Sequence, residues 1–329
     1  MTTAQRLAWF QEADFGLFVH WSTSCVGGVE IGWGLGRREV EPAVYERWMD
    51  EFRPSAYDPD SWARLAAEAG MRYAVLTTKH HDGFCMWPTD QTDYHVGNTP
   101  GGQDLVGPFV EAFRAAGLKV GFYHSLIDWR HPNYRIDHYH PLRDDADALA
   151  EPRDWSVYVT YLHNQVDELL SRYGKIDVMW FDYSYVAEDG EVMAGQKWQA
   201  DELLAMVRKK QPEIVINNRL ALRYSFEGPR NGFTPPDWMQ YGGDFDTPER
   251  YVPGEFEPER PWESCQTMSE TWAWNPRDKE YKSAEVLVAE LEQANRYGGN
   301  VLLNVGPKPD GLLPEIEVAR LREIADLRK

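Results

Sequence analysis

The sequence contains Ile176-Asp177-Val178-Met179-Trp180-Phe181-Asp182, an apolar stretch that ends in a carboxylate. It follows Tyr173-Gly174, a pair typical of the end of a helix. A short apolar run in this position predicts a strand of a parallel sheet that is covered on both faces. Because the active sites of such sheets lie where the strands end, Asp182 is a candidate for chemistry rather than for structure.

Three other predicted strands also end in polar, titratable residues. They cover residues 15–19, 73–78 and 120–123 and run into His20-Trp21, Lys79-His80-His81-Asp82 and His124-Ser125. Strand ends of a parallel sheet meet at one edge, so these side chains predict one shared site.

Amphipathic helices alternate with the predicted strands along the whole chain. We expect helices at 59–70, 105–116, 155–173, 198–210, 283–297 and 315–328, with further strands at 213–219 and 300–305. Repeated strand–helix units of this length favour a (β/α)8 TIM-like barrel, and 329 residues suit a single domain that covers 1–329. Two long loops, 128–153 and 224–261, interrupt the alternation and are expected to be functional.

The composition excludes several classes of partner. A net charge of −19 disfavours nucleic acid and anionic membrane surfaces, which would repel such a protein. No apolar run is long enough to span a membrane, and the first residues lack the apolar segment of a secretory signal, so we expect a cytoplasmic protein. The odd number of widely spaced cysteines argues against a disulfide framework.

The motifs give little support for a metal site, for a nucleophilic serine or for a phosphate-binding loop. His80 and His81 are adjacent, and adjacent side chains of a regular strand point to opposite faces, so a shared metal would require an irregular strand end. The sequence has no Gly-x-Ser-x-Gly elbow and no Walker-type loop after the first strand. We therefore expect neither a metal nor another cofactor.

Paired carboxylates fit the pattern better. Asp182 lies at a strand end, and several glutamates lie on later loops: Glu227, Glu249, Glu263 and Glu270. Glycoside cleavage needs one ionised carboxylate to attack the sugar and one protonated acid to release the leaving oxygen. Histidines at strand ends, together with Arg219, suit the binding of sugar hydroxyls, and the 14 tryptophans suit contacts with sugar faces.

Six motifs occur in the order that is found in one known family. They are Phe15-Gly16-Leu17-Phe18-Val19-His20-Trp21, Lys79-His80-His81-Asp82-Gly83-Phe84, Trp180-Phe181-Asp182, Asn217-Asn218-Arg219, Pro261-Trp262-Glu263-Ser264-Cys265 and the block from Gly298-Gly299-Asn300 to Gly306-Pro307. Over residues 7 to 315 the sequence resembles the α-L-fucosidases of glycoside hydrolase family 29. The resemblance implies a distorted (β/α)8-like barrel, no metal, and a retaining two-step hydrolysis of terminal α-L-fucose from oligosaccharides or glycoconjugates.

The resemblance also implies roles for individual residues. Asp182 corresponds to the nucleophile, and the implied sugar contacts are His20, Trp33, His80, His81, Tyr123, Trp180, Arg219 and Trp272. Glu249 matches the loop position of the acid/base, Glu263 is the alternative, and Glu227 is a third candidate.

The sequence departs from the family pattern at three places. Gly32 precedes Trp33 where a Glu is usual, with Glu30 two residues earlier, and Tyr183-Ser184-Tyr185 follows Asp182 where Gly is common, which predicts a more closed rim. The chain is too short for the C-terminal β-sandwich of many relatives, and we expect only the barrel, with a homo-oligomer as one option. Two alternative functions stay open: a non-catalytic carbohydrate-binding barrel and a metal-dependent hydrolase on a TIM barrel.

Overall fold

A curled parallel sheet forms the centre of the molecule. The structure, a computed structural model, describes residues 2–222, 238–253 and 260–329. The sheet has seven strands in the order β7-β4-β3-β2-β1-β9-β8. Their bounds are β1 Phe15–Val19, β2 Tyr73–Lys79, β3 Lys119–Ser125, β4 Val178–Asp182, β7 Val215–Ile216, β8 Trp262–Gln266 and β9 Gly299–Val305. All pairs in this sheet are parallel, as the strand–helix alternation predicted.

An irregular segment joins the two edges of this sheet. Residues 244–249 lie between β7 and β8 and form parallel bridges with both, through the pairs Asn217–Phe245, Asp246–Trp262 and Glu249–Cys265. The bridges place this segment where an eighth barrel strand belongs, which makes the fold a distorted TIM-like barrel, as predicted. Glu249 therefore lies on the segment that connects the sheet edges.

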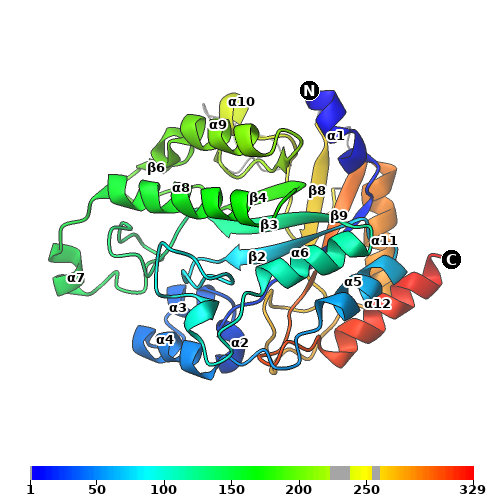
Figure 1. Ribbon diagram of the computed structural model, residues 1–329, viewed down its shortest axis with the longest axis horizontal. Coiled ribbons are helices and arrows are strands. Elements are labelled where there is room, and N and C mark those ends of the chain that lie inside the picture. Colours follow the sequence, from blue (N-terminus) through cyan, green and yellow to red (C-terminus); the bar gives the residue numbers. More distant parts are fainter. Residues whose placement is uncertain (1, 223–237, 254–259) are drawn as a thin grey trace.

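Helices cover the outer face of the sheet. The longer ones are α1 Thr3–Gln11, α4 Pro42–Glu51, α5 Pro59–Glu68, α6 Val106–Ala115, α8 Trp155–Arg172, α9 Ala200–Lys210, α11 Ala284–Arg296 and α12 Glu315–Leu327. Figure 1 shows α8 and α9 side by side next to β4, and α5 beside both α6 and α12. Side-chain caps begin α5, α8 and α11, where Asp58, Asp154 and Ser283 accept backbone N–H hydrogen bonds.

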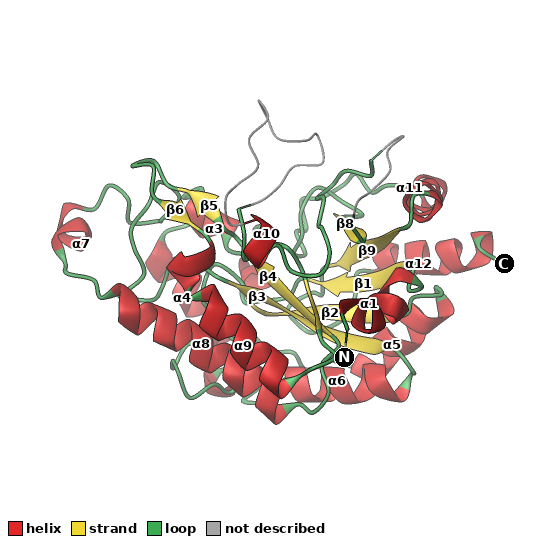
Figure 2. Cartoon of the chain, turned by 90° about the horizontal axis from the view of Figure 1, so that it is seen from above, coloured by secondary structure: helices red, strands yellow, loops and turns green. Residues whose placement is uncertain are grey.

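Shorter elements lie in the connections. They are α2 Ser24–Gly27, α3 Trp33–Gly36, α7 Ala146–Ala150, α10 Trp238–Tyr241, the 3₁₀ helices Val96–Asn98 and Gly195–Trp198, and the hairpin of β5 Tyr185–Val186 and β6 Val192–Met193. Figure 2 shows loops, with β5 and β6, along the upper edge of the view and α6, α8 and α9 along the lower edge. Two predicted bounds differ: β7 is shorter than 213–219, and a 3₁₀ turn replaces the start of the helix predicted at 198–210.

Two apolar clusters fill the fold. The larger packs the helices against the outer face of the sheet, and the smaller one includes Phe18, Tyr73, Tyr123, Trp180 and Leu302. Cys25, Cys85 and Cys265 are all described and buried, and none of the three forms a disulfide, in agreement with the expectation of no disulfide framework. No helix in the described part of the chain has the length and apolar character needed to cross a membrane.

Candidate active site

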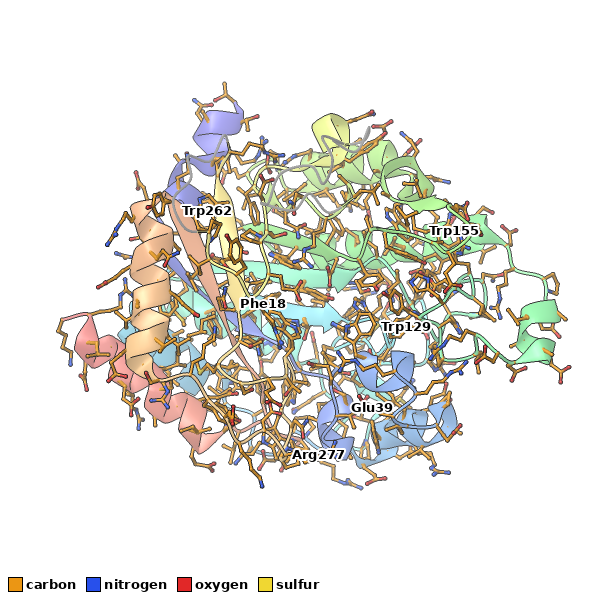
Figure 3. All side chains as sticks on the ribbon, turned by 180° about the vertical axis from the view of Figure 1, so that it is seen from behind. Phe18, Glu39, Trp129, Trp155, Trp262 and Arg277 are labelled. Carbon is orange, nitrogen blue, oxygen red and sulfur yellow. The ribbon has the colours of Figure 1, made fainter. Side chains whose placement is uncertain are left out.

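A cavity of about 220 Å³ opens at the ends of the strands. Its wall contains all ten residues that the sequence proposed as nucleophile, favoured acid/base and sugar contacts, namely His20, Trp33, His80, His81, Tyr123, Trp180, Asp182, Arg219, Glu249 and Trp272. Figure 3 shows Phe18, which also lines the cavity, among the strands at the middle of the sheet, with Trp129 further toward the loops. The strand ends thus converge on one site.

Asp182 is held in its ionised form at the end of β4. Its Oδ1 accepts a hydrogen bond from Arg219 Nη1 at 2.6 Å, and its Oδ2 accepts one from the Tyr123 hydroxyl at 2.8 Å. Burial opposes ionisation, but the charge and hydrogen bond of Arg219 and the hydrogen bond of Tyr123 outweigh it, so the pKa of Asp182 lies below its ordinary value. The lowered pKa favours the ionised carboxylate of Asp182 in the cavity.

Arg219 also binds the second carboxylate of the cavity. Its Nη2 lies 3.1 Å from Glu249 Oε2, so one guanidinium connects Asp182 and Glu249. Burial disfavours the charge of Arg219, yet the two carboxylates raise its pKa above the ordinary arginine value. The guanidinium also lies over the Trp180 ring, 4.4 Å from its centroid, and this contact fixes its plane.

Glu263 lies behind the cavity wall rather than in it. Its side chain is fully buried and accepts hydrogen bonds from the Tyr73 hydroxyl and from Trp180 Nε1, the latter at 2.9 Å. Burial raises the pKa of Glu263 to about 7, against the opposing effect of these two hydrogen bonds. Its contacts orient the Trp180 indole. Glu227 lies outside the described residues.

His80 and His81 both face the cavity because β2 becomes irregular at its end. The register between β2 and β3 shifts between Thr77 and Lys79, and the two imidazole rings then lie with centroids 3.9 Å apart. Burial lowers the pKa of both histidines well below the ordinary value, and the positive charges of Lys79 and Arg219 add to the effect at His81, so both imidazoles are neutral. Adjacent histidines could share one site only through this irregularity.

These histidines form a possible metal-ligand cluster with Asp182. One ligand atom of each residue lies within 4.8 Å of the others. Asp182, however, already binds the guanidinium of Arg219, whose permanent positive charge would oppose a cation at the same oxygens. The donor set therefore fits a polar organic ligand better than a metal ion.

A hydrogen-bond network fixes His20 and the Trp272 loop together. Asn304 donates through Nδ2 to the Trp272 carbonyl at 2.6 Å, so its Oδ1 faces His20 Nδ1, also at 2.6 Å. His20 Nδ1 must then carry the proton, which leaves Nε2 as an acceptor. Burial lowers the pKa of His20 to about 3, despite the hydrogen bond to Asn304.

Glu30 binds the backbone beside Trp272. Its buried carboxylate accepts hydrogen bonds from Trp272 N at 2.9 Å and from Ala273 N at 3.2 Å. At Gly32, where a Glu is usual, an added Cβ would lie 2.7 Å from His80 Nδ1, so the close approach of His80 leaves no room for a side chain. The carboxylate of Glu30, two residues before Gly32, therefore binds the backbone of the loop that carries Trp272.

The family model for α-L-fucosidases matches residues 2–328 of the chain. The chain belongs to the α-L-fucosidase family. It is 32% identical over 338 residues to the tissue α-L-fucosidase of Bos taurus, covering 95% of this chain and 65% of that protein. The chain thus spans about two thirds of the length of this relative.

Solved structures of this family share the fold. An α-L-fucosidase isoenzyme 1 from Paenibacillus thiaminolyticus superimposes with a TM-score of 0.90 at 41% identity and covers 99% of this chain and 75% of that one. A family 29 α-L-fucosidase from Bacteroides thetaiotaomicron, trapped as a covalent intermediate with 2-fluoro-fucosyl fluoride, has a TM-score of 0.81 at 27% identity, covering 98% of this chain and 74% of that one.

Five residues that line the cavity were not among the site residues predicted from the sequence: Phe18, Tyr183, Ser184, Ala221 and Cys265. Phe18 and Cys265 occur in motifs of the resemblance, so their positions in those motifs were an available signal. Tyr183 and Ser184 follow Asp182 directly, and the departure from Gly at this place was the signal for them. Ala221 carries no chemical signal in the sequence.

Proposed function

We propose that the protein is a retaining α-L-fucosidase in which Asp182 is the nucleophile and Glu249 is the acid/base. The observation that carries this proposal is the sharing of one buried guanidinium by two carboxylates in a single cavity. Binding of both carboxyl groups to one guanidinium supports retention, which needs a separation of about 5–5.5 Å between the carboxyls, whereas inversion needs roughly 6.5–9.5 Å. The trapped covalent intermediate of the Bacteroides relative supports the same two-step course.

The first step forms a bond between an Asp182 carboxylate oxygen and C1 of fucose. The bond from C1 to the leaving oxygen breaks, and Glu249 gives its proton to that oxygen. In the second step Glu249 takes a proton from water, the hydroxide attacks C1, and Asp182 leaves as a carboxylate. The lowered pKa of Asp182 suits this role, because the nucleophile must be ionised before the sugar binds.

The neutral histidines bind the sugar hydroxyls. A neutral imidazole accepts one hydrogen bond and donates another, so it can read the position of a hydroxyl without adding charge to the cavity. His20 presents Nε2 as an acceptor, and a hydroxyl of the sugar donates to it. Arg219 binds both carboxyl groups and balances the charge of Asp182 in the free enzyme, in which Glu249 carries the proton that it later donates.

Replacing the nucleophile tests the first assignment. Asp182→Gly should abolish turnover of 4-nitrophenyl α-L-fucoside, because no group can attack C1, and azide should restore part of it by entering the vacated space. The same Asp→Gly change at Asp189, an exposed residue of the β5–β6 connection, is the matched control and should leave turnover intact. Normal activity of Asp182→Gly would refute the assignment.

Replacing Glu249 and Glu263 tests the assignment of the acid/base. Glu249→Gln should lower kcat by about 10²–10⁴-fold for substrates with a poor leaving group and much less for 2,4-dinitrophenyl fucoside, which needs no acid. Glu263→Gln should lower both rates by a similar, smaller factor, because Glu263 orients Trp180. The reverse pattern would assign the acid/base role to Glu263.

The alternatives give different results in the same assay. A metal-dependent hydrolase, which the His80, His81 and Asp182 cluster would serve, loses activity with EDTA, whereas we expect unchanged activity. A carbohydrate-binding protein without catalysis would bind fucose and cleave no aryl fucoside at any pH.

A further inference from the structure

Tyr183 has a backbone conformation that disfavours its side chain. It follows Asp182 directly and has a φ of +82°. This left-handed region is open to glycine, whereas the Cβ of any larger residue meets the backbone there. A bulky residue that keeps such a conformation at a cavity suggests that its side chain has a function that offsets the strain.

The Tyr183 ring forms part of the cavity wall and connects to other aromatic rings. Its centroid lies 4.9 Å from that of His81, 5.6 Å from that of Trp33 and 6.1 Å from that of Tyr139. Trp33 and Tyr139 contact each other edge to face at 5.4 Å. Tyr183, Trp33 and Tyr139 therefore make one continuous aromatic surface, which we call the tyrosine wall.

The tyrosine wall lies at the mouth of the cavity. The base of the cavity is nearly inaccessible and is formed by His20, His80, His81, Tyr123 and Asp182. The mouth of the cavity is formed by partly exposed residues, namely Trp33, Tyr183, Ser184, Glu249 and Trp272. Tyr139 is 37% exposed and continues the wall outward. A fucose whose C1 meets Asp182 fills the buried part, so the group attached to C1 leaves through this mouth.

We propose that the tyrosine wall, with Tyr183 as its central residue, binds the first sugar of the leaving group. This inference rests on the proposed fucosidase function and adds a residue that selects the leaving group when fucose is linked to another sugar ring. The C–H face of a pyranose is apolar and packs against aromatic rings, which contribute a large contact area with little rotamer freedom. Tyr183 is then a specificity-determining residue, and its contacts with Trp33, His81 and Tyr139 hold the ring at the mouth.

Paired substitutions separate the ring from the strain. Tyr183→Gly and Tyr183→Ala both remove the ring, but only glycine relieves the positive φ. The Gly variant should melt about 1–2 °C above the Ala variant, which reverses the usual order of these residues. Gln199, with a φ of +48° on an exposed turn and outside the cavity wall, is the matched control. Gln199→Gly and Gln199→Ala should show the same order of melting.

The decisive measurement is a ratio of two kcat/KM values. One substrate is a fucosyl disaccharide, chosen as the fastest of the 1→2, 1→3, 1→4 and 1→6 isomers, and the other is α-L-fucosyl fluoride, which has no leaving sugar. The ratio of disaccharide to fluoride should fall about tenfold in Tyr183→Gly and in Tyr183→Ala, stay near the wild-type value in Tyr183→Phe, and not change in the Gln199 variants.

Each other result is informative. An unchanged ratio in both ring-deletion variants would overturn the proposed wall, and an Ala variant that melts above the Gly variant would overturn the strain argument. If the wild-type protein hydrolyses fucosyl fluoride but the ratio does not fall in the Tyr183 variants, only the wall is overturned, and the fucosidase proposal stands. A wild-type protein that cleaves neither substrate would overturn the fucosidase proposal and the wall together.

Discussion

Removing the Tyr123 hydroxyl should shift the pH dependence of catalysis. In Tyr123→Phe the ring stays in place, but Asp182 Oδ2 loses a donor at 2.8 Å. Tyr123 is almost fully buried, so water cannot easily replace the lost hydrogen bond. The ionised form of Asp182 is the form that this bond stabilises, so the pKa of Asp182 must rise in the variant.

The size of the shift follows from the chemistry of the bond. A hydrogen bond to a charged group contributes about 1.5–3 kcal/mol, and each pKa unit corresponds to about 1.4 kcal/mol. We therefore expect the pKa of Asp182 to rise by about one to two units. Arg219 still binds Oδ1 at 2.6 Å, so the carboxylate stays ionised at neutral pH and activity there is retained in part.

The assay is the pH profile of kcat/KM on 4-nitrophenyl α-L-fucoside, whose acid limb reports the ionisation of the free enzyme. The limb should move to higher pH by about one to two units in Tyr123→Phe. Thermal stability offers a second readout. A carboxylate with a lowered pKa stabilises the fold above its ordinary pKa and loses this contribution as the pH falls through the lowered value. The melting difference between wild type and variant should accordingly shrink in acid.

Tyr158→Phe is the matched control for this experiment. Tyr158 is also fully buried, and its hydroxyl donates to the Leu126 carbonyl at 2.6 Å rather than to the Asp182 carboxylate. This variant should lose stability without moving the acid limb. An acid limb that does not move in Tyr123→Phe, or that moves equally in Tyr158→Phe, would refute the reasoning.

Two further predictions concern buried carboxylates outside the cavity. Glu263 has a raised pKa of about 7, so its neutral form stabilises the fold at low pH. This contribution to stability is lost as the pH rises from the ordinary glutamate value through 7. Glu263→Gln cannot ionise, so the melting temperature of the variant relative to wild type should increase between pH 5 and 8, and a constant difference would contradict the raised pKa. Asp244 binds Arg6 at 2.7 Å and Arg208 at 2.5 Å with little exposure. Asp244→Asn should cost about 3 kcal/mol of unfolding free energy in a denaturant titration, because two arginines lose their counter-charge. A cost below 1 kcal/mol would show that solvent compensates for the loss.

Local sequence signals predicted six of the seven strands of the main sheet and most of the longer helices, whereas the family resemblance supplied several residues of the cavity, among them Trp33, Glu249 and Trp272. Apolar runs such as 176–182 are typical of covered parallel strands, and parallel strands bring their ends together whatever the details of packing. Asp182, His20 and His80 could therefore be assigned to one site from the strand ends, whereas Tyr123 was assigned from the resemblance to the family. The bounds of β7 were less accurate, because the chain there has few ladder partners: β7 pairs with β4 over two residues.

The roles of the glutamates could not be separated in the same way. Glu249 and Glu263 both follow from the motifs, and nothing local distinguishes a carboxylate in a cavity from one behind its wall. The distinction depends on segment 244–249, which bridges the edges of the sheet and turns Glu249 toward Arg219. That bridging is a long-range backbone pairing, and sequence periodicity does not encode it.

By itself, the sequence determined the fold class, the edge of the sheet that carries the chemistry, and the residue types available there, because the alternation of strands and helices is a local pattern of the chain and implies a parallel sheet. Only the tertiary structure decided which groups form hydrogen bonds and ion pairs with one another. The irregular end of β2 that turns His80 and His81 to one side, the guanidinium that links Asp182 to Glu249, and the left-handed backbone of Tyr183 all depend on contacts between segments far apart in sequence. Electrostatic energies vary with distance and burial, and packing sets both.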